Sequence, residues 1–360
     1  MTKKHIYING RFLTQTMTGV HRYAYEMCKA LRLLGLEFTL ISPDKSPLPS
    51  YDVRGWNIKT YGIGNSHFWE QLSLPTFFVG RKNYLLLNLT GLGSILVKNK
   101  ITTIHDLAFL ENPNWYSKSY YYYYRLLTPW VARSSQSIIT VSDCSREEIL
   151  RFYPFLRKKR IEVIYNACGI HKVEVKGTDT ILKNNYCLAV QSIDPRKNLG
   201  VLLQAFKDRK DMKLYLVGGS NAVFSKVKDL AQIEHSDNIV YLGRVSDDRL
   251  VKLYTKAKAF ISPSLFEGFG IPLIEAMSLR CPVICSDIPV YHEVCADAAI
   301  YFNPESADEL SSCIDKVCTM DNKTLEETIE RGTERAGKFS WQKSAQKLIE
   351  LINDQITKEQ

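Results

Sequence analysis

The chain has 360 residues, of which 45% are hydrophobic and 24% are charged, and this suits a globular enzyme of about two domains. No run of about 18 apolar residues occurs, and the first residues lead directly into a strand-like segment, so we expect neither a transmembrane helix nor a secretory signal. The nine cysteines are odd in number and contain no Cys-x-x-Cys pair, so we expect reduced thiols in a cytoplasmic protein and no zinc site.

Short apolar segments that suit buried strands alternate with helix-like segments along the chain. In the first half, the strand-like segments are Ile6–Ile8, Phe38–Ile41, Leu85–Leu89, Ile101–Ile104, Ile138–Val141 and Val163–Ile164, with helical spacing over Val20–Leu34 and Tyr120–Ala132. The second half repeats the pattern with Tyr186–Val190, Leu214–Val217, Ile239–Leu242, Phe260–Ser262 and Val283–Cys285. This order predicts an α/β protein with two Rossmann-like, doubly wound domains.

The junction between these domains is expected between Cys168 and Asn184. There, Lys172–Asp179 is polar and has no helical periodicity. We therefore place the first domain at residues 1–170 and the second at residues 171–339.

The positive charge of the chain lies in its first half. Residues 1–168 contain 22 Lys and Arg against 11 Asp and Glu, whereas the remainder contains 25 against 27. The excess is densest in Arg151–Arg160, where bulky apolar side chains alternate with cations. Such a segment suits an anionic lipid surface, and a solvated helix end whose aromatic rings face the core is an equally good interpretation. Nucleic acid is not expected as a partner, because no recognisable binding motif accompanies the charge.

Five consecutive tyrosines, Tyr120–Tyr124, fall within one of the predicted helices. They cannot all face one side of a helix, so some of them are expected on the surface. Ordinary side-chain packing is the favoured interpretation, and the wall of an acceptor groove is the alternative.

A glycine loop, a helix start and two carboxylates occur together within Glu267–Glu275. The strand-like run Ala259–Ser262 precedes this segment, and Pro272 suits the first position of the helix that follows. Gly268 and Gly270 would then occupy a strand-to-helix turn, where free N–H groups and the helix dipole favour an anion.

The two carboxylates suggest what accompanies that anion. Glu267 lies on the loop and Glu275 on the first helical turn, and carboxylates accept hydrogen bonds from sugar hydroxyls. The segment therefore predicts a site for a sugar attached to a diphosphate. Taken alone, it is equally compatible with an ordinary strand–loop–helix connection that carries two solvated glutamates.

The second half of the chain contains a series of short motifs: Asp194–Leu199 with its Arg-Lys-Asn, Leu216–Gly219, Ile239–Val245, Ile261–Gly270, Glu275–Met277, Cys281–Ile284 and His292–Val294. In these motifs and their order, the second half resembles the family 4 glycosyltransferases over nearly its whole length. The first half is similar to the family more loosely, in Thr18–Tyr23, Thr103–Asp106 and Ile139–Ser142. The similarity is closest to bacterial enzymes that add mannose or related sugars to O-antigen or capsule intermediates.

This resemblance implies the two-domain GT-B architecture, in which two Rossmann-like domains face each other across a cleft. It also implies that the first domain takes the acceptor and the second takes the nucleotide-sugar donor. A C-terminal helix, placed at residues 340–356, would cross back to the first domain.

The resemblance further implies roles for individual residues of the second domain. Arg196 and Lys197 would hold the donor diphosphate, as suits two cations beside a helix start. Glu275 would bind the ribose hydroxyls, while Glu267 would face the transferred sugar. The backbone of the Gly268–Gly270 loop, which includes Phe269, would contact sugar hydroxyls and phosphate.

Two residues of the first domain complete the implied site. His105 stands at the carboxyl end of a strand and would reach across the cleft to the sugar, although a lone histidine is more often structural. Gly19 would let its loop approach the diphosphate, where a side chain would collide. With Glu267, Arg196 and Lys197, His105 makes up the expected catalytic group.

The implied reaction is transfer with retention of anomeric configuration, in which the leaving diphosphate helps to accept the acceptor's proton. Charge stabilisation by Arg196, Lys197 and the helix amides would then dominate. No Asp-x-Asp motif occurs in the chain, so we expect neither a metal nor another cofactor.

The predicted protein is therefore a cytoplasmic glycosyltransferase, peripheral to the inner face of the membrane through its basic region. It would move a hexosyl group, with mannose favoured, onto a growing and lipid-linked glycan. GDP-mannose is the favoured donor and a UDP-sugar is the alternative. Two other functions stay open on sequence alone: a sugar-nucleotide epimerase or hydrolase of the same architecture, and a basic binding protein without catalysis.

Overall fold

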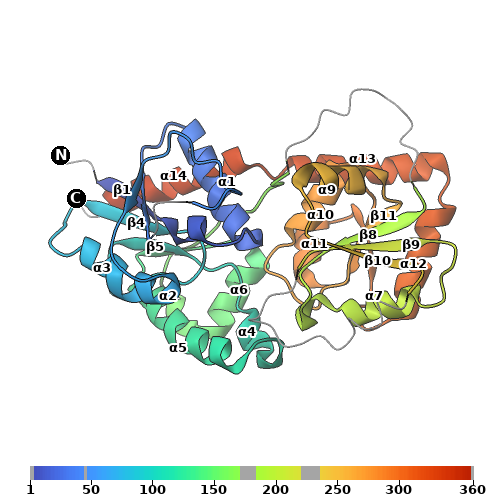
Figure 1. The fold of residues 1–360 in the computed structure, drawn as a ribbon, viewed down its shortest axis with the longest axis horizontal. Coiled ribbons are helices and arrows are strands. Elements are labelled where there is room, and N and C mark those ends of the chain that lie inside the picture. The colour runs from blue at the N-terminus through green and yellow to red at the C-terminus, as the bar shows by residue number, and fades with distance from the viewer. Residues whose placement is uncertain (1–3, 44–46, 171–183, 220–235, 358–360) are drawn as a thin grey trace. The chain divides into compact units, whose positions relative to one another are not determined.

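The computed structural model describes residues 4–43, 47–170, 184–219 and 236–357, which form two compact units (Figure 1). The first unit comprises Met1–Leu110, Tyr121–Asn166 and Ser340–Gln360, and the second comprises Glu111–Tyr120 and Ala167–Phe339. The predicted junction at Lys172–Asp179 lies outside the described residues.

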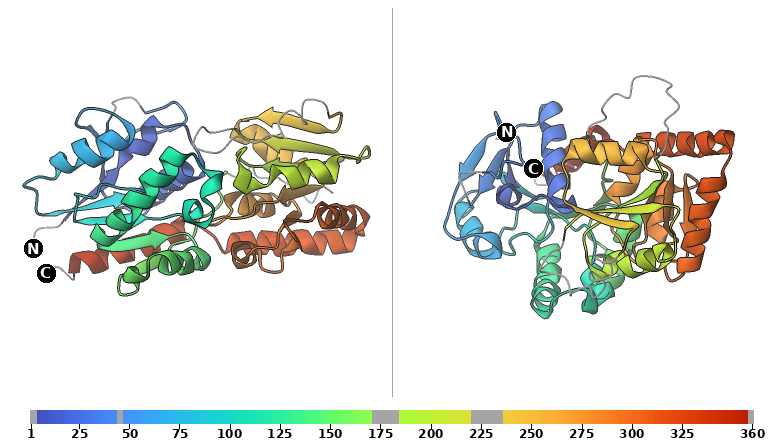
Figure 2. Two further views of the ribbon diagram at one scale, coloured as in Figure 1. Left: turned by 90° about the horizontal axis from the view of Figure 1, so that it is seen from below. Right: turned by 45° about the vertical axis from the view of Figure 1, so that its right-hand side comes forward.

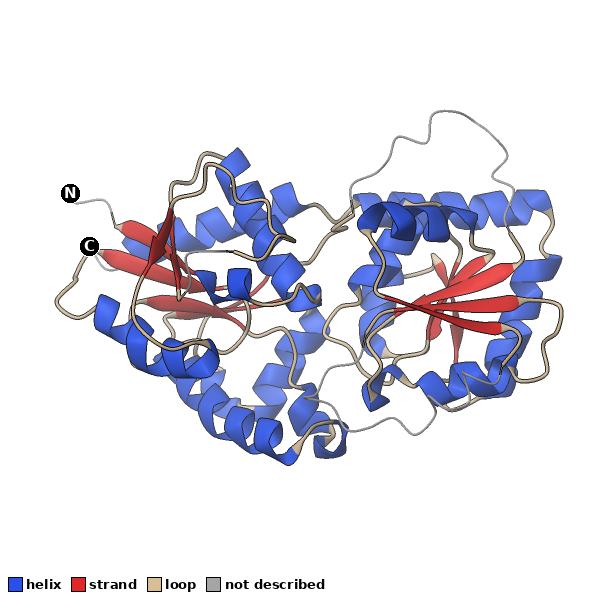
Figure 3. Ribbon diagram, viewed as in Figure 1, coloured by secondary structure: helices blue, strands red, loops and turns tan. Residues whose placement is uncertain are grey.

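The first unit is built on a seven-stranded parallel sheet in the order β3-β2-β1-β4-β5-β6-β7. Its strands are β1 (His5–Asn9), β2 (Thr39–Ser42), β3 (Ile58–Thr60), β4 (Tyr84–Asn88), β5 (Lys100–Thr103), β6 (Ser137–Thr140) and β7 (Ile161–Val163). The central strands are apolar on both faces because helices cover both sides of a parallel sheet, and β4 is buried at every position (Figure 3).

Helices of several lengths surround this sheet. They are α1 (Gly19–Leu33), α2 (Ser66–Phe68), α3 (Leu74–Phe77), α4 (Ala108–Glu111), α5 (Lys118–Ser134) and α6 (Asp143–Phe152). Short 3-10 turns occupy Gly10–Thr14 and Pro154–Leu156, and a π-helical turn occupies Trp69–Ser73 between α2 and α3. The 3-10 turn Pro113–Trp115 belongs to the second unit.

The C-terminal helix α14 (Trp341–Thr357) belongs to the first unit, where it lies beside α1 (Figures 1 and 2). The Trp341 ring packs edge-on against Tyr23 of α1. Further along α14, Gln355 Nε2 donates a hydrogen bond of 2.6 Å to Ser137 Oγ of β6. Residues that follow the whole second unit in the sequence therefore complete the core of the first.

The second unit has a six-stranded parallel sheet in the order β10-β9-β8-β11-β12-β13. The strands are β8 (Tyr186–Val190), β9 (Lys213–Val217), β10 (Ile239–Gly243), β11 (Ala259–Ser262), β12 (Val283–Ser286) and β13 (Ala299–Phe302). The helices described in this unit are α7 (Leu199–Phe206), α9 (Asp247–Lys256), α10 (Ile271–Ser278), α11 (Pro289–Cys295), α12 (Ala307–Thr319) and α13 (Asn322–Gly337), with a 3-10 turn at Pro195–Lys197.

The structure confirms the predicted fold class, since both units are parallel α/β sheets between layers of helices (Figure 3). The sequence pattern missed the edge strands β3 and β13, which are only partly buried and so carry a weaker apolar signal. In both sheets the connections reverse direction once, between β1 and β4 and between β8 and β11. The crevice at the carboxyl ends of such a strand pair is where open α/β sheets bind their ligands.

Candidate active site

The segment Glu267–Glu275 spans the end of the loop that joins β11 to α10 and the first five residues of α10. Gly270 is the N-cap of α10 and has a φ of 99°, a conformation that favours glycine. A Cβ at this position would lie 2.8 Å from Leu273 Cδ1. The helix begins at Ile271, so Pro272 is its second residue and not its first.

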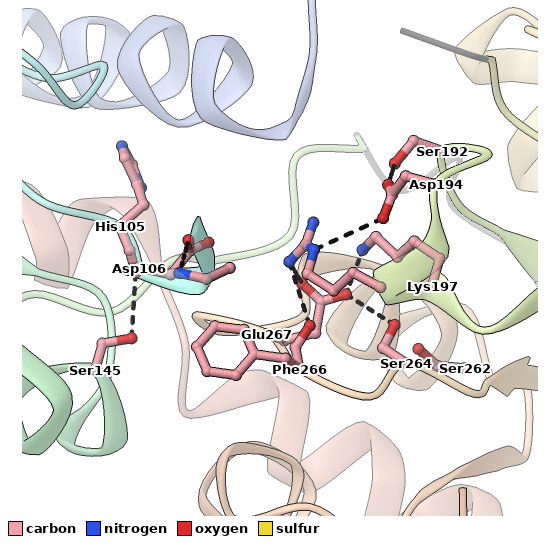
Figure 4. A network of polar contacts seen from close by, with 12 residues as sticks. His105, Asp106, Ser145, Ser192, Asp194, Lys197, Ser262, Ser264, Phe266 and Glu267 are labelled. Carbon is pink, nitrogen blue, oxygen red and sulfur yellow. Dashed lines mark hydrogen bonds and ion pairs between the residues drawn. The ribbon is translucent and has the colours of Figure 1, made fainter. Parts of the chain in front are cut away.

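A cluster of charged side chains lies next to this loop, at the reversal point between β8 and β11 (Figure 4). Arg196 Nη1 donates to Glu267 Oε2 at 3.1 Å and to the Phe266 carbonyl at 3.2 Å, and Lys197 Nζ donates to Glu267 Oε1. The hydroxyl of Ser264 donates to the same Oε1 at 2.9 Å. Three residues predicted to act on the donor are therefore brought together, and each is largely buried.

The surroundings of Glu267 keep its carboxylate ionised. Burial by itself would raise the pKa of this group, but the charges of Lys197 and Arg196 and the hydrogen bonds from Lys197 and Ser264 outweigh it and lower the pKa to about 2. A fixed negative charge thus lies between two fixed positive charges. This arrangement orients both cations before any ligand arrives.

Asp194 lies beside Arg196 at the edge of the cluster and was not assigned a role from the sequence. Its side chain is fully buried, and its Oδ1 lies 3.8 Å from Arg196 Nε. The Ser192 hydroxyl donates to the other oxygen, Oδ2, at 2.6 Å (Figure 4). The Asp-Pro-Arg-Lys spacing was the available sequence signal, because it places this carboxylate two residues before Arg196.

Glu275 lies deeper than predicted. It is the fifth residue of α10, beyond the first helical turn, and it is buried. Tyr254 of α9 donates a hydrogen bond of 3.2 Å to Glu275 Oε2. Burial, followed by the charge of Glu275, raises the pKa of Tyr254 well above its ordinary value, so the phenol stays a donor at neutral pH.

The side chain of Phe269 does not line the surface of the loop. It is buried and packs edge-on against Phe339, with ring centroids 5.6 Å apart. At this position only the backbone is left to contact a ligand, as the sequence predicted.

His105 and Gly19 lie in the first unit. The His105 Nε2–H donates to the Leu89 carbonyl at 2.9 Å, and burial lowers the pKa of the imidazole. The ring is therefore neutral at neutral pH, with Nδ1 as an acceptor when Nε2 carries the proton. Asp106 accepts from the Ala108 N–H at 3.1 Å, so its main contact is a cap on α4.

Gly19 is the first residue of α1, and a Cβ added to it would meet nothing within 4 Å. No packing among the described residues of the first unit therefore requires a glycine here. Close approach of a ligand, the reason given from the sequence, stays a prediction.

Among the residues that the structure describes, no group of three or more His, Cys, Asp or Glu side chains is placed to hold a metal ion. No helix in the described ranges is long and apolar enough to cross a membrane. All nine cysteines are free thiols.

Comparisons with known proteins cover both units. Residues 174–335 match the family described as glycosyl transferases group 1, and residues 17–170 match glycosyltransferase family 4. The O-antigen chain mannosyltransferase RfbU of Salmonella typhimurium is 33% identical over 228 residues, which are 62% of each chain. The O-antigen chain mannosyltransferase B of Escherichia coli is 31% identical over 260 residues, or 68% of each chain.

Solved structures agree on the architecture. Anabaena Alr3699/HepE in complex with UDP-glucose superposes with a TM-score of 0.73 at 16% identity, covering 98% of this chain and all of the other. At that identity the likeness shows the fold alone, and the fold is GT-B. Together, the family matches, these relatives and the two parallel sheets identify the chain as a member of the family 4 glycosyltransferases.

Proposed function

We propose that this glycosyltransferase moves a mannosyl group from GDP-mannose onto a growing glycan, with retention of configuration. The observation that carries the proposal is the Arg196–Lys197–Glu267 cluster beside the Gly270 turn, which combines two cations and one carboxylate at one strand-to-helix connection. The two O-antigen mannosyltransferases support the choice of sugar and of acceptor class. Neither the family nor these relatives favour an epimerase, a hydrolase or a non-catalytic binding protein.

The residues of the cluster suggest how the reaction proceeds. The bond between the anomeric carbon and the diphosphate oxygen breaks, and a bond from the acceptor oxygen to the same face of that carbon forms. The acceptor proton passes to the departing phosphate oxygen. Arg196 and Lys197 stabilise the negative charge that develops on the diphosphate, and fixed groups of this kind usually make the largest contribution to catalysis.

Glu267 has a separate role in this proposal. Its ionised carboxylate holds both cations in place and presents a negative charge toward the transferred sugar, whose ring becomes positively charged in the transition state. Because two cations already face the diphosphate, we propose that the reaction needs no metal. Glu275, oriented by Tyr254, would bind the ribose hydroxyls.

A donor panel tests the proposal. The protein is heated with GDP-mannose, UDP-glucose, UDP-N-acetylglucosamine or a dTDP-sugar, each with and without EDTA, and the melting temperature is recorded. A ligand that binds only the folded state raises this temperature. We expect the largest rise with GDP-mannose, unchanged by EDTA, and a rise with a UDP-sugar alone would show that the donor assignment is wrong.

We also propose that the acceptor is lipid-linked and that the first unit rests on an anionic membrane surface. On α5, Tyr122, Leu126 and Trp130 follow one another at intervals of four residues and are 63%, 64% and 57% exposed. This spacing places them on one face of the helix. Phe155, which is 47% exposed, lies near the C-terminal end of α5, since the guanidinium of Arg133 at that end is placed over its ring.

Cations flank this apolar stripe. Arg125 and Arg133 of α5 are exposed, as are Arg157 and Lys158 beyond Phe155. In the predicted lipid-binding segment itself, Tyr153 and Leu156 are buried, so only part of Arg151–Arg160 faces outward. Aromatic and apolar side chains ringed by Arg and Lys suit insertion between anionic headgroups.

Vesicle flotation tests this surface. We expect the protein to float with vesicles that contain phosphatidylglycerol, less so at high salt, and not with pure phosphatidylcholine. Leu126→Gln and Trp130→Ser should abolish flotation, whereas Leu33→Gln, which replaces an 87% exposed residue of α1, should not. Unchanged flotation of both stripe variants would contradict the proposal.

A further inference from the structure

A second buried carboxylate lies in the first unit, at the reversal point between β1 and β4. Glu70 is fully buried in the π-helical turn Trp69–Ser73. Asn9, the last residue of β1, donates through Nδ2 to Glu70 Oε1 at 2.7 Å and to Oδ1 of Asn88, the last residue of β4, at 3.1 Å. The carboxylate is thus tied to the carboxyl ends of both strands that flank the reversal point, where ligands of such sheets bind.

The charged partners of Glu70 are close but loosely placed. Arg11 Nε lies 3.4 Å from Oε1 and His67 Nδ1 lies 3.5 Å from Oε2. Neither nitrogen has a hydrogen-bond partner in the part of the chain that the structure describes, and nor does Oε2. Burial of incompletely satisfied charged groups is costly, so packing alone does not explain why this cluster exists.

Aromatic rings adjoin the cluster on its accessible side. His67 is 33% exposed, and its ring lies 4.8 Å from that of Tyr123 and 5.8 Å from that of Tyr124. Burial, followed by the charge of Glu70, raises the pKa of Tyr123 to about 12, so its hydroxyl stays protonated. The Tyr123 hydroxyl also has no hydrogen-bond partner among the described residues.

The chemistry of these groups selects a class of ligand. The positive charge of Arg11 is balanced by the negative charge of Glu70, so the cluster has little net attraction for an anion, and a phosphate would face the carboxylate. Hydroxyl groups both donate and accept, which matches a site that offers a carboxylate, a guanidinium, an imidazole and a phenol. Aromatic rings, in turn, pack against the apolar C–H face of a sugar.

We propose that this cluster is the acceptor subsite and that it recognises an uncharged sugar ring. His67 and Tyr123 contact the ring, and Glu70 is a positioning residue that acts through His67 and Arg11. The inference rests on the proposed function, because it assumes a glycan acceptor. It adds the residues that recognise the acceptor. It also assigns Tyr123, within the run of five tyrosines, to the wall of the acceptor site.

Steady-state kinetics with separate variation of donor and acceptor test the subsite. The acceptors are octyl glycosides of mannose, glucose, galactose, rhamnose and N-acetylglucosamine, and the best of them is used with each variant. We expect His67→Ala and Glu70→Gln to raise the acceptor KM about tenfold, as for the loss of one good hydrogen-bonded contact, with the donor KM and slow donor hydrolysis unchanged. Glu70→Asp should recover part of the loss.

Matched controls are His5→Ala, at the opposite end of β1, and Glu26→Gln, a buried glutamate of α1 that pairs with Lys29 at 3.1 Å. Both should keep the wild-type acceptor KM. If Glu70→Gln fails to fold, His67→Ala, at a partly exposed position, decides the question.

Three outcomes would overturn the subsite: wild-type acceptor KM in the folded His67 and Glu70 variants, an equal rise in donor KM, or no transfer to any octyl glycoside. Decyl phosphate is also tested as a competitor of the acceptor. If it competed more strongly than the octyl glycosides, and if this competition depended on His67, the site would recognise phosphate and not an uncharged sugar. Failure of the proposed function has a different signature, since no nucleotide sugar would then raise the melting temperature or be hydrolysed by the wild type.

Discussion

Each unit places a buried glutamate between an arginine and a second basic side chain at the reversal point of its sheet, but the two clusters differ in how well they are satisfied. Glu267 accepts hydrogen bonds from Arg196, Lys197 and Ser264. Glu70 accepts one from Asn9, while Arg11 and His67 approach it only to 3.4 and 3.5 Å. A satisfied cluster is organised before its ligand binds, whereas an incompletely satisfied one leaves hydrogen-bonding capacity for the ligand.

The largest difference should appear when a cation is removed from the second unit. Lys197→Ala takes away one of the two charges that we propose to face the diphosphate, so we expect kcat/KM to fall by about 10²–10³-fold, the range for loss of a fixed charge-stabilising group. The transfer of radiolabelled mannose to the acceptor measures kcat/KM. Lys213→Ala, an exposed lysine of β9 in the same unit, is the control. A loss of less than threefold would remove Lys197 from the catalytic group.

The cluster around Glu267 should also link the stability of the protein to pH. Because the pKa of Glu267 is lowered from 4.5 to about 2 by folding, its ionised form stabilises the protein above the unfolded value, and this contribution is lost as the pH falls from about 4.5 to 2. Between those limits the stability lost by wild type should exceed that lost by Glu267→Gln by about 3 kcal/mol. Urea unfolding at several pH values measures the difference, with exposed Glu327→Gln as the control. Parallel curves for wild type and Glu267→Gln would contradict the proposed charge cluster.

Substitution of two glycines, Gly19 and Gly270, distinguishes a glycine that the ligand requires from one that the fold requires. Gly19→Ala should leave the melting temperature unchanged, because the new Cβ meets no atom within 4 Å, yet it should raise the donor KM about tenfold if the donor approaches α1 closely. Gly270→Ala should lower the melting temperature as well, since its φ is 99° and its Cβ would clash with Leu273. Wild-type donor KM in Gly19→Ala would remove that glycine from the site.

The smallest effect on stability is expected from the first unit. The double variant Arg11→Met, Glu70→Leu removes both charges of a poorly satisfied buried pair, and such replacements are often neutral or stabilising. We therefore expect a change in unfolding free energy within about 1 kcal/mol, together with loss of acceptor recognition. Chemical denaturation and the acceptor KM are measured side by side. Strong destabilisation would show that the pair holds the π-helical turn in place and is not kept for a ligand.

The charge cluster of the second unit was largely predictable because its residues lie in short contiguous motifs. The glycines and helix start within Glu267–Glu275 suggested an anion site, and the family resemblance added the adjacent Arg196 and Lys197. The pairing of Lys197 with Glu267, 70 residues apart, was not predictable, because it depends on β8 and β11 becoming neighbours. The burial of Glu275 was missed for the same kind of reason, since α9 covers it through Tyr254.

The cluster around Glu70 in the first unit was much less predictable. Asn9, Arg11, Glu70 and Asn88 stand in no common motif, and they meet only because β1 pairs with β4. His67 of α2 and Glu70 of the following π-helical turn also belong to this cluster. The spacing of apolar residues in the sequence does not predict a π-helical turn.

The sequence by itself determined the two-domain α/β class, the family and the glycine turn before α10, because these depend on local periodicity, glycine positions and contiguous motifs. Only the tertiary structure decided which charges neutralise one another, which tyrosines of α5 are exposed and where α14 packs. Such properties arise from contacts between residues 61 to 218 positions apart, and chain topology creates those contacts where a linear pattern cannot show them.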